Sequence, residues 1–153
     1  MKHWLALSAL VVVLDQISKS IIVHWFARGW GIEVTPFFNL VLAYNRGAAF
    51  SLLAGAAGWQ RGFFIALALA AVAVILWLLR KYSGQPLFCF ALALILGGAV
   101  GNLIDRALVG EVVDFLDFHA YGWHWPAFNL ADSAITCGAA LLIWDGLRPR
   151  QRD

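Results

Sequence analysis

The chain has 153 residues, of which 62% are hydrophobic and only 13% are charged. Because so few charged residues cannot cover the surface of a water-soluble domain, the composition favours a membrane protein. The formal net charge of +2 is too small to indicate a nucleic-acid-binding protein. Cys89 and Cys137 lie in apolar stretches, which predicts neither a disulfide framework nor a zinc site.

Four apolar segments predict four transmembrane helices. A helix needs about 20 mostly apolar residues to cross a bilayer, and the segments that meet this requirement are residues 4–24, 61–79, 87–106 and 128–147. The first begins like a secretory signal peptide, but its apolar pattern resumes after Asp15 and no small-residue cleavage site follows. We therefore expect a permanent first helix and an all-α membrane protein with a single domain, residues 1–153.

The positions of Lys and Arg predict the orientation, since cytoplasmic loops carry an excess of these residues. The basic residues assigned to the inner side are Lys2, Arg80, Lys81, Arg148, Arg150 and Arg152. Those assigned to the outer side are Arg28, Arg46, Arg61 and Arg106. Both termini are therefore predicted to be cytoplasmic, with two long external connections at residues 25–60 and 107–127.

The external connections are expected to form a small β-containing extracytoplasmic subdomain. Residues 34–44 are rich in aromatic and β-branched residues and predict one strand, and the partial alternation of residues 111–118 predicts a second. A turn is predicted at residues 45–47. The apolar run at residues 48–53 is too short to span a membrane, so we expect it to form an interfacial flap.

Two charged residues, Asp15 and Lys19, interrupt the first apolar segment. A charge at the centre of a spanning helix costs about 2.5–3.5 kcal/mol, so such residues are expected to face the bundle interior. Their spacing of four residues places them on one helix face, where they can neutralise each other. A structural ion pair that tethers the first helix is the simpler interpretation, and substrate positioning and direct action in the chemistry are the alternatives.

The third segment ends in glycines and polar residues. Gly97 and Gly101 are spaced to let another helix approach closely. Asn102, Asp105 and Arg106 place three polar groups in one helical turn at the bilayer edge, where they need partners. We predict a hydrogen-bonding scaffold beside a site, with ordinary interface anchoring as the alternative.

Acidic residues gather in the second half of the chain, where Asp114 and Asp132 stand in apolar surroundings near the predicted outer surface. If the second external connection folds back, the two carboxyl groups meet and share a proton, because both cannot ionise cheaply. One then activates a water and the other protonates the leaving group of a peptide. A solvated acid beside a helix-terminal Asp is the alternative, and spacing alone does not decide between them.

Other functions are less well supported. His119 and His124, beside Asp114 and Asp117, leave a metal site open, although no H-E-x-x-H frame is present. We expect no metal and no cofactor. A proton-coupled transporter and a non-catalytic assembly factor are the competing functions, but no internal repeat appears and the acids cluster at one interface.

Five motifs, in matching order along nearly the whole chain, resemble the lipoprotein signal peptidase (signal peptidase II) family. They are DQISK at 15–19, NRGAAF at 45–50, GNLIDR at 101–106, VVDF at 112–115 and FNLADS at 128–133. The resemblance implies a multi-pass enzyme of the bacterial cytoplasmic (inner) membrane with its site near the outer surface. It further implies cleavage of diacylglyceryl-modified prolipoproteins just before the lipidated cysteine, and inhibition by globomycin-like peptides.

The resemblance also implies roles for individual residues. Asp114 and Asp132 match the family's catalytic aspartates, and the matching supporting positions are Asp15, Asn45, Asn102, Arg106 and Asn129. We add Lys19 and Gly47 as supporting residues, the latter because it sets the turn before the expected flap. The expected partners are lipidated prolipoproteins and membrane lipids, and a monomer is expected.

Overall fold

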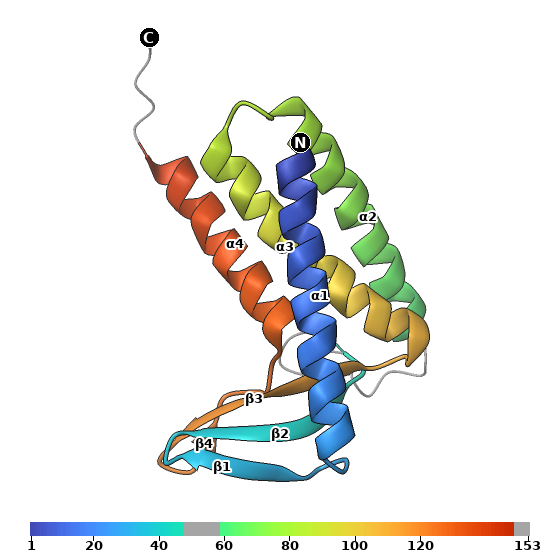
Figure 1. The fold of residues 1–153 in the computed structure, drawn as a ribbon, viewed down its shortest axis with the longest axis vertical. Helices are drawn as coiled ribbons and strands as arrows, with labels where there is room; N and C mark the ends of the chain where they lie inside the picture. The colour runs from blue at the N-terminus through green and yellow to red at the C-terminus, as the bar shows by residue number, and fades with distance from the viewer. Residues whose placement is uncertain (48–58, 149–153) are drawn as a thin grey trace.

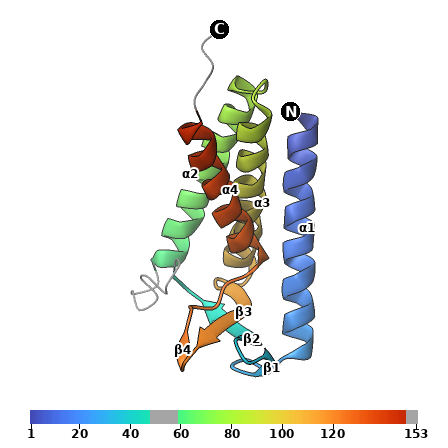
Figure 2. The ribbon, with the colours of Figure 1, turned by 90° about the vertical axis from the view of Figure 1, so that its left-hand side faces the viewer.

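A computed structural model of the protein describes residues 1–47 and 59–148. The flap expected at residues 48–53 therefore lies outside the described residues. The described chain forms a helical bundle with a small β-sheet at one end (Figure 1). Met1 and the C-terminal end of the last helix lie at the opposite end of the bundle from the sheet (Figures 1 and 2).

Among the described residues four helices form the bundle, and each is long and apolar enough to cross a membrane. They are α1 (Lys2–Trp25), α2 (Gln60–Lys81), α3 (Pro86–Leu108) and α4 (Leu130–Leu147). The four predicted spans are confirmed, with ends displaced by at most two residues. α3 packs against each of the other three helices, so it is the central element.

Small residues on α3 allow the neighbouring helices to approach closely. A methyl group added at Gly98 would lie 2.3 Å from the carbonyl oxygen of Ala131 in α4. One added at Gly97 would lie 2.8 Å from the carbonyl oxygen of Ser8 in α1, and one at Gly101 would meet the Asp15 carboxylate at 2.5 Å. The predicted packing role of the glycines is confirmed, because only glycine fits backbones this close.

Within residues 1–47 and 59–148 the sheet has four antiparallel strands in the order β1-β2-β3-β4. They are β1 (Gly31–Thr35), β2 (Phe38–Asn45), β3 (Val112–Ala120) and β4 (Trp123–His124). The single strand predicted at residues 34–44 is wrong, since this segment is part of a hairpin that turns at residues 36–37. Proline at position 36 explains the interruption, because it donates no hydrogen bond to a ladder.

The second predicted strand is confirmed as β3, but β4 was not predicted. β4 follows a two-residue turn in which Tyr121 has φ 52° and Gly122 has φ 79°. Positive φ at both central positions belongs to the tight turns that join antiparallel strands. Tyr121 gives no sequence signal for that conformation, which non-glycine residues seldom adopt.

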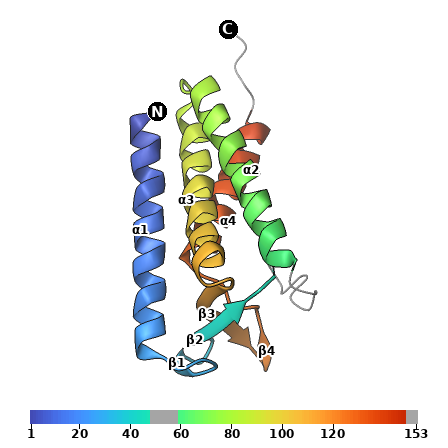
Figure 3. The same cartoon turned by 90° about the vertical axis from the view of Figure 1, so that its right-hand side faces the viewer.

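The last turns of α1 extend down to the level of the sheet (Figure 3). There Ile22 of α1 forms a small apolar cluster with Leu42 of β2 and with Val113 and Phe115 of β3, all four being buried. Gly110, with φ 88°, forms the sharp turn that leads from α3 into β3. These contacts hold the start of β3 directly under the ends of the helices.

Candidate active site

A cavity of about 800 Å³ lies between the sheet and the ends of α3 and α4. Its walls include both aspartates predicted to form the catalytic pair, Asp114 and Asp132. The predicted supporting residues that also line it are Asn45, Asn102 and Arg106. The structure therefore brings together residues that are far apart in the sequence.

Asp114 reaches the cavity from near the start of β3. β2 carries one extra residue between Leu40 and Ala43, opposite Leu116 and Asp114, and such irregularities re-aim side chains next to sites. On its other edge β3 pairs with the segment before α4, since Leu116 N donates to Phe128 O at 2.8 Å. That pairing sets the N-terminus of α4 beside Asp114.

Asp114 is buried, with 3% of its surface exposed, so the alternative interpretation of a solvated acid is wrong. Asn129 Nδ2 donates to its Oδ1 at 2.7 Å, and Asn45 Nδ2 donates to its Oδ2 at 3.2 Å. Burial raises the pKa of Asp114 to about 7, and the neighbouring charge of Asp132 adds to the increase.

Asn129 joins the two carboxyl groups. It is fully buried and caps α4: its Oδ1 accepts from Asp132 N at 2.9 Å, while its own N donates to Asp132 Oδ2 at 3.4 Å. Because the amide oxygen is occupied by the cap, the NH2 group points toward Asp114. One side chain thus places Asp132 in the first helical turn and serves Asp114 directly.

Asn102 of α3 serves the other carboxyl group. Its Nδ2 donates to Asp132 Oδ1 at 2.8 Å, and its Oδ1 accepts from Lys19 Nζ at 2.9 Å. An ammonium group only donates, so Lys19 fixes which end of the amide faces Asp132. The predicted hydrogen-bonding scaffold at the end of α3 is confirmed for Asn102.

Lys19 is the centre of a buried charged cluster that connects α1 with α3. Lys19 Nζ lies 2.8 Å from Asp15 Oδ2 and 2.8 Å from Asp105 Oδ2. Together with Asn102, these acceptors satisfy all three ammonium hydrogens. Asp15 Oδ1 accepts from the backbone N of Ala131 in α4 at 3.0 Å, so the predicted ion pair is confirmed and reaches three helices.

The remaining predicted supporting residues lie at the end of β2. Asn45 Oδ1 accepts from Gly47 N at 2.9 Å, which forms the predicted turn and leaves Asn45 Nδ2 to face Asp114. Arg106 Nη2 donates to Gly47 O at 3.0 Å, and its guanidinium lies 5.1 Å from the centre of the Phe64 ring. Arg106 therefore connects α3, α2 and the turn at the cavity wall.

The histidines that left a metal site open lie farther along the sheet. His124 Nδ1 lies 2.9 Å from both carboxylate oxygens of Asp117, and the His119 and His124 rings stack at 4.8 Å. Asn39 Nδ2 donates to Asp117 at 2.9 Å. Burial opposes ionisation of Asp117, but these partners outweigh it and hold its pKa below the usual value. Asp114 contacts none of these groups through the hydrogen bonds described above.

Residues 7–148 match a model of the family described as signal peptidase (SPase) II. The chain belongs to the signal peptidase II family. A lipoprotein signal peptidase of Ralstonia nicotianae is 62% identical over 149 residues, covering 97% of this chain and 86% of the relative. One of a Janthinobacterium species is 60% identical over 148 residues, covering 97% of this chain and 90% of the relative.

Two solved structures of a bacterial membrane enzyme, obtained by the in meso method, share the fold. The one at 2.3 Å resolution has a TM-score of 0.86 and 32% sequence identity, covering 100% of this chain and 94% of that chain. The one at 1.9 Å has a TM-score of 0.87 and 33% identity, covering 97% of this chain and 94% of that chain. The chain is thus a membrane peptidase of this family.

Several contacts at the site have no signal in the sequence. Gln16 belongs to the DQISK motif, and its Nε2 donates to Asp105 Oδ1 at 2.9 Å and to the carbonyl oxygen of Gly101 at 3.2 Å. Arg28, Arg46 and Glu111 also line the cavity, where the two arginines pair with Glu111. The sequence pattern predicts no partner for Arg28, Arg46 or Glu111, because partners distant in sequence leave no local signal.

Replacement of Lys19 by Met should destabilise the protein. Asp15 and Asp105 would lose their cation while remaining buried, and breaking one partner of a buried ion pair costs about 3–5 kcal/mol. Thermal unfolding in detergent micelles measures the effect. Lys81→Met, at the exposed end of α2, is the matched control and should change the free energy of unfolding by no more than about 0.5 kcal/mol. Equal effects of the two variants would contradict this account of the cluster.

Proposed function

We propose that this peptidase removes the signal peptide of diacylglyceryl-modified prolipoproteins by cleaving just before the lipidated cysteine, with Asp114 and Asp132 as its catalytic pair. The observation that carries the proposal is that two carboxyl groups share one cavity and one amide, Asn129. Membership of the signal peptidase II family supports the substrate class.

In the proposed reaction Asp132 is the base and Asp114 is the acid. Asp132 lies in the first turn of α4 and accepts from Asn102 and from the backbone of Asn129. Hydrogen bonds and a helix N-terminus both favour an ionised carboxylate. Asp114 is the more deeply buried of the two and holds its proton up to about pH 7.

The steps follow from these protonation states. A water between the carboxyl groups gives a proton to Asp132 as it attacks the carbonyl carbon of the scissile peptide. Asp114 donates a hydrogen bond to the carbonyl oxygen and later passes its proton to the departing amine. The supporting residues proposed to hold this pair in place are Asp15, Lys19, Asn45, Gly47, Asn102, Arg106 and Asn129. No covalent enzyme intermediate is required.

The cavity suits a substrate that stays in the bilayer. Ile135, Thr136 and Cys137 of α4 line one side of it, so a lipidated cysteine and an apolar signal helix can enter between lipid and protein. We propose that a globomycin-like peptide competes for the same space. One copy supplies both aspartates, and we propose that the enzyme acts as a monomer.

Substitution of either aspartate should remove activity. Asp114→Asn and Asp132→Asn cannot exchange the proton, and each should lower kcat by roughly 10²–10⁴-fold, the range of general acid–base catalysis. The double variant should be no worse than either single one, since the pair acts as a unit. Cleavage of a lipidated precursor by purified enzyme measures this. Asp117→Asn is the control and should retain substantial activity; near-parent turnover by either dyad variant would refute the mechanism.

Activity should fall as the pH rises through about 7, the pKa of Asp114, because the proposed acid then loses its proton. Asn45 donates to Asp114 and so stabilises the ionised form. Its loss in Asn45→Ala should raise this pKa and move the alkaline limb of the kcat/KM profile to higher pH. If the alkaline limb of the Asn45→Ala profile moves to lower pH, the group that loses its proton there is not Asp114.

Both termini are proposed to face the cytoplasm of a bacterium, with the cavity near the outer surface of the inner membrane. The excess of Lys and Arg at the termini and at the α2–α3 connection supports this orientation. Reporters fused after Arg80 or at the C-terminus should therefore read cytoplasmic, and one inserted near Gly122 should read external. A C-terminal reporter that reads external would contradict the proposed orientation.

A further inference from the structure

We propose that Arg28, Arg46 and Glu111 form a subsite for the first residues that follow the lipidated cysteine, and that this subsite favours an acidic side chain over a basic one. The proposal rests on the peptidase function proposed above. It concerns the part of the substrate that remains with the mature lipoprotein.

The three residues form an ion triplet at the cavity wall. Glu111 precedes β3 and its side chain is 10% exposed, whereas the side chains of Arg28 and Arg46 are 63% and 64% exposed. Arg28 Nη2 lies 3.2 Å from Glu111 Oε2, and Arg46 Nε donates to Glu111 Oε1. The Arg28 guanidinium also lies 4.6 Å from the centre of the Tyr44 ring. Glu111 therefore holds both guanidinium groups in place, and the Tyr44 ring adds a second contact to Arg28.

The triplet carries an excess of positive charge. Burial opposes ionisation of Glu111, but its two arginine partners outweigh burial and hold its pKa below the usual value. One carboxylate against two guanidinium groups leaves a net charge of +1 at neutral pH. Each guanidinium has five hydrogens to donate, so the exposed part of each can bind a further carboxylate.

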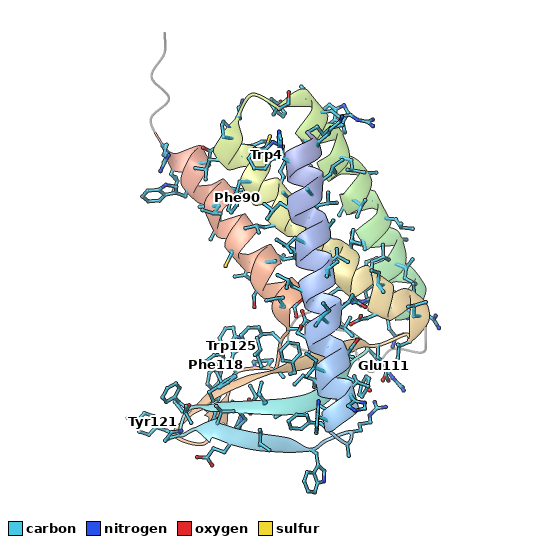
Figure 4. All side chains as sticks on the ribbon, viewed as in Figure 1. Trp4, Phe90, Glu111, Phe118, Tyr121 and Trp125 are labelled. Atoms are coloured by element: carbon cyan, nitrogen blue, oxygen red, sulfur yellow. The ribbon has the colours of Figure 1, made fainter. Side chains whose placement is uncertain are left out.

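The triplet and the apolar residues of α4 line different parts of the same cavity. Ile135 and Cys137 of α4 line the apolar side. Glu111 lies toward the lower ends of α2 and α3, whereas Trp125 lies below α4 (Figure 4). Arg46 directly follows Asn45, which donates to Asp114, so the triplet begins one residue from a side chain that contacts the proposed catalytic pair.

The charged and apolar sides of the cavity predict where each part of the substrate binds. A signal helix and two acyl chains are apolar, so they belong on the side of α4 that meets lipid. The chain after the cysteine leaves toward water and is the part that tolerates a charged surface. An acidic side chain there would be attracted by the exposed guanidinium groups, and a lysine would be repelled.

The test uses three synthetic lipidated precursor peptides that differ only in the residue after the lipidated cysteine, which is Asp, Gln or Lys. Their kcat/KM values are measured in uncharged detergent micelles. The parent enzyme should cleave the Asp peptide roughly two- to fivefold faster than the Lys peptide, the range expected of one exposed ion pair. Arg46→Gln should reduce this ratio, and Arg46→Glu should bring it to one or below.

The ratio is taken within one enzyme preparation, so it does not depend on how much of a variant folds. Arg80→Gln removes an exposed arginine at the distant end of α2 and should leave the ratio unchanged. Cleavage of all three peptides at equal kcat/KM, or equal ratios for Arg46→Glu and the parent, would overturn the subsite. Failure of the parent enzyme to cleave even the Gln peptide would instead overturn the proposed peptidase function, and the subsite with it.

Discussion

The orientation of three asparagine side chains is the constraint on which the site depends. Each has its amide oxygen occupied by a group that can only donate: Gly47 N for Asn45, Lys19 for Asn102 and Asp132 N for Asn129. Each NH2 group is thereby turned toward a cavity carboxylate. Neutral donors thus hold two carboxyl groups at one cavity, an arrangement that suits the proton sharing proposed for Asp114 and Asp132.

The buried ion cluster on α1 gives this arrangement its rigidity. A lysine and two aspartates in a bilayer are costly unless every hydrogen bond is made. Lys19 meets that condition with three acceptors, one of which is the amide of Asn102. The same cluster positions the N-terminus of α4 through Asp15 and Ala131. Loss of the cation would therefore disturb the orientation of Asn102 as well as helix packing.

Much of the fold could be predicted from the sequence, because a span of about 20 apolar residues is a strong local signal. The ion pair of Asp15 and Lys19 also follows from spacing along one helix. The sheet was harder, since Pro36 splits what composition alone marks as one strand. Within the site, Asp114 and Asp132 can be predicted because an acidic side chain in apolar surroundings is energetically unfavourable. The pairing of Glu111 with Arg28 and Arg46 cannot, because it depends on chain segments that meet only in the folded protein.

Asp117 illustrates why acidic residues in one strand have different consequences. It stands three residues from Asp114 on β3, and both are buried. Asp117 meets His124, which can carry a positive charge, whereas Asp114 meets amides and a second carboxyl group. Burial is the largest cause of the raised pKa of Asp114, and the charge of Asp132 adds to it, whereas the partners of Asp117 outweigh burial and lower its pKa. The partners that meet each carboxyl group therefore decide whether burial raises its pKa or is outweighed.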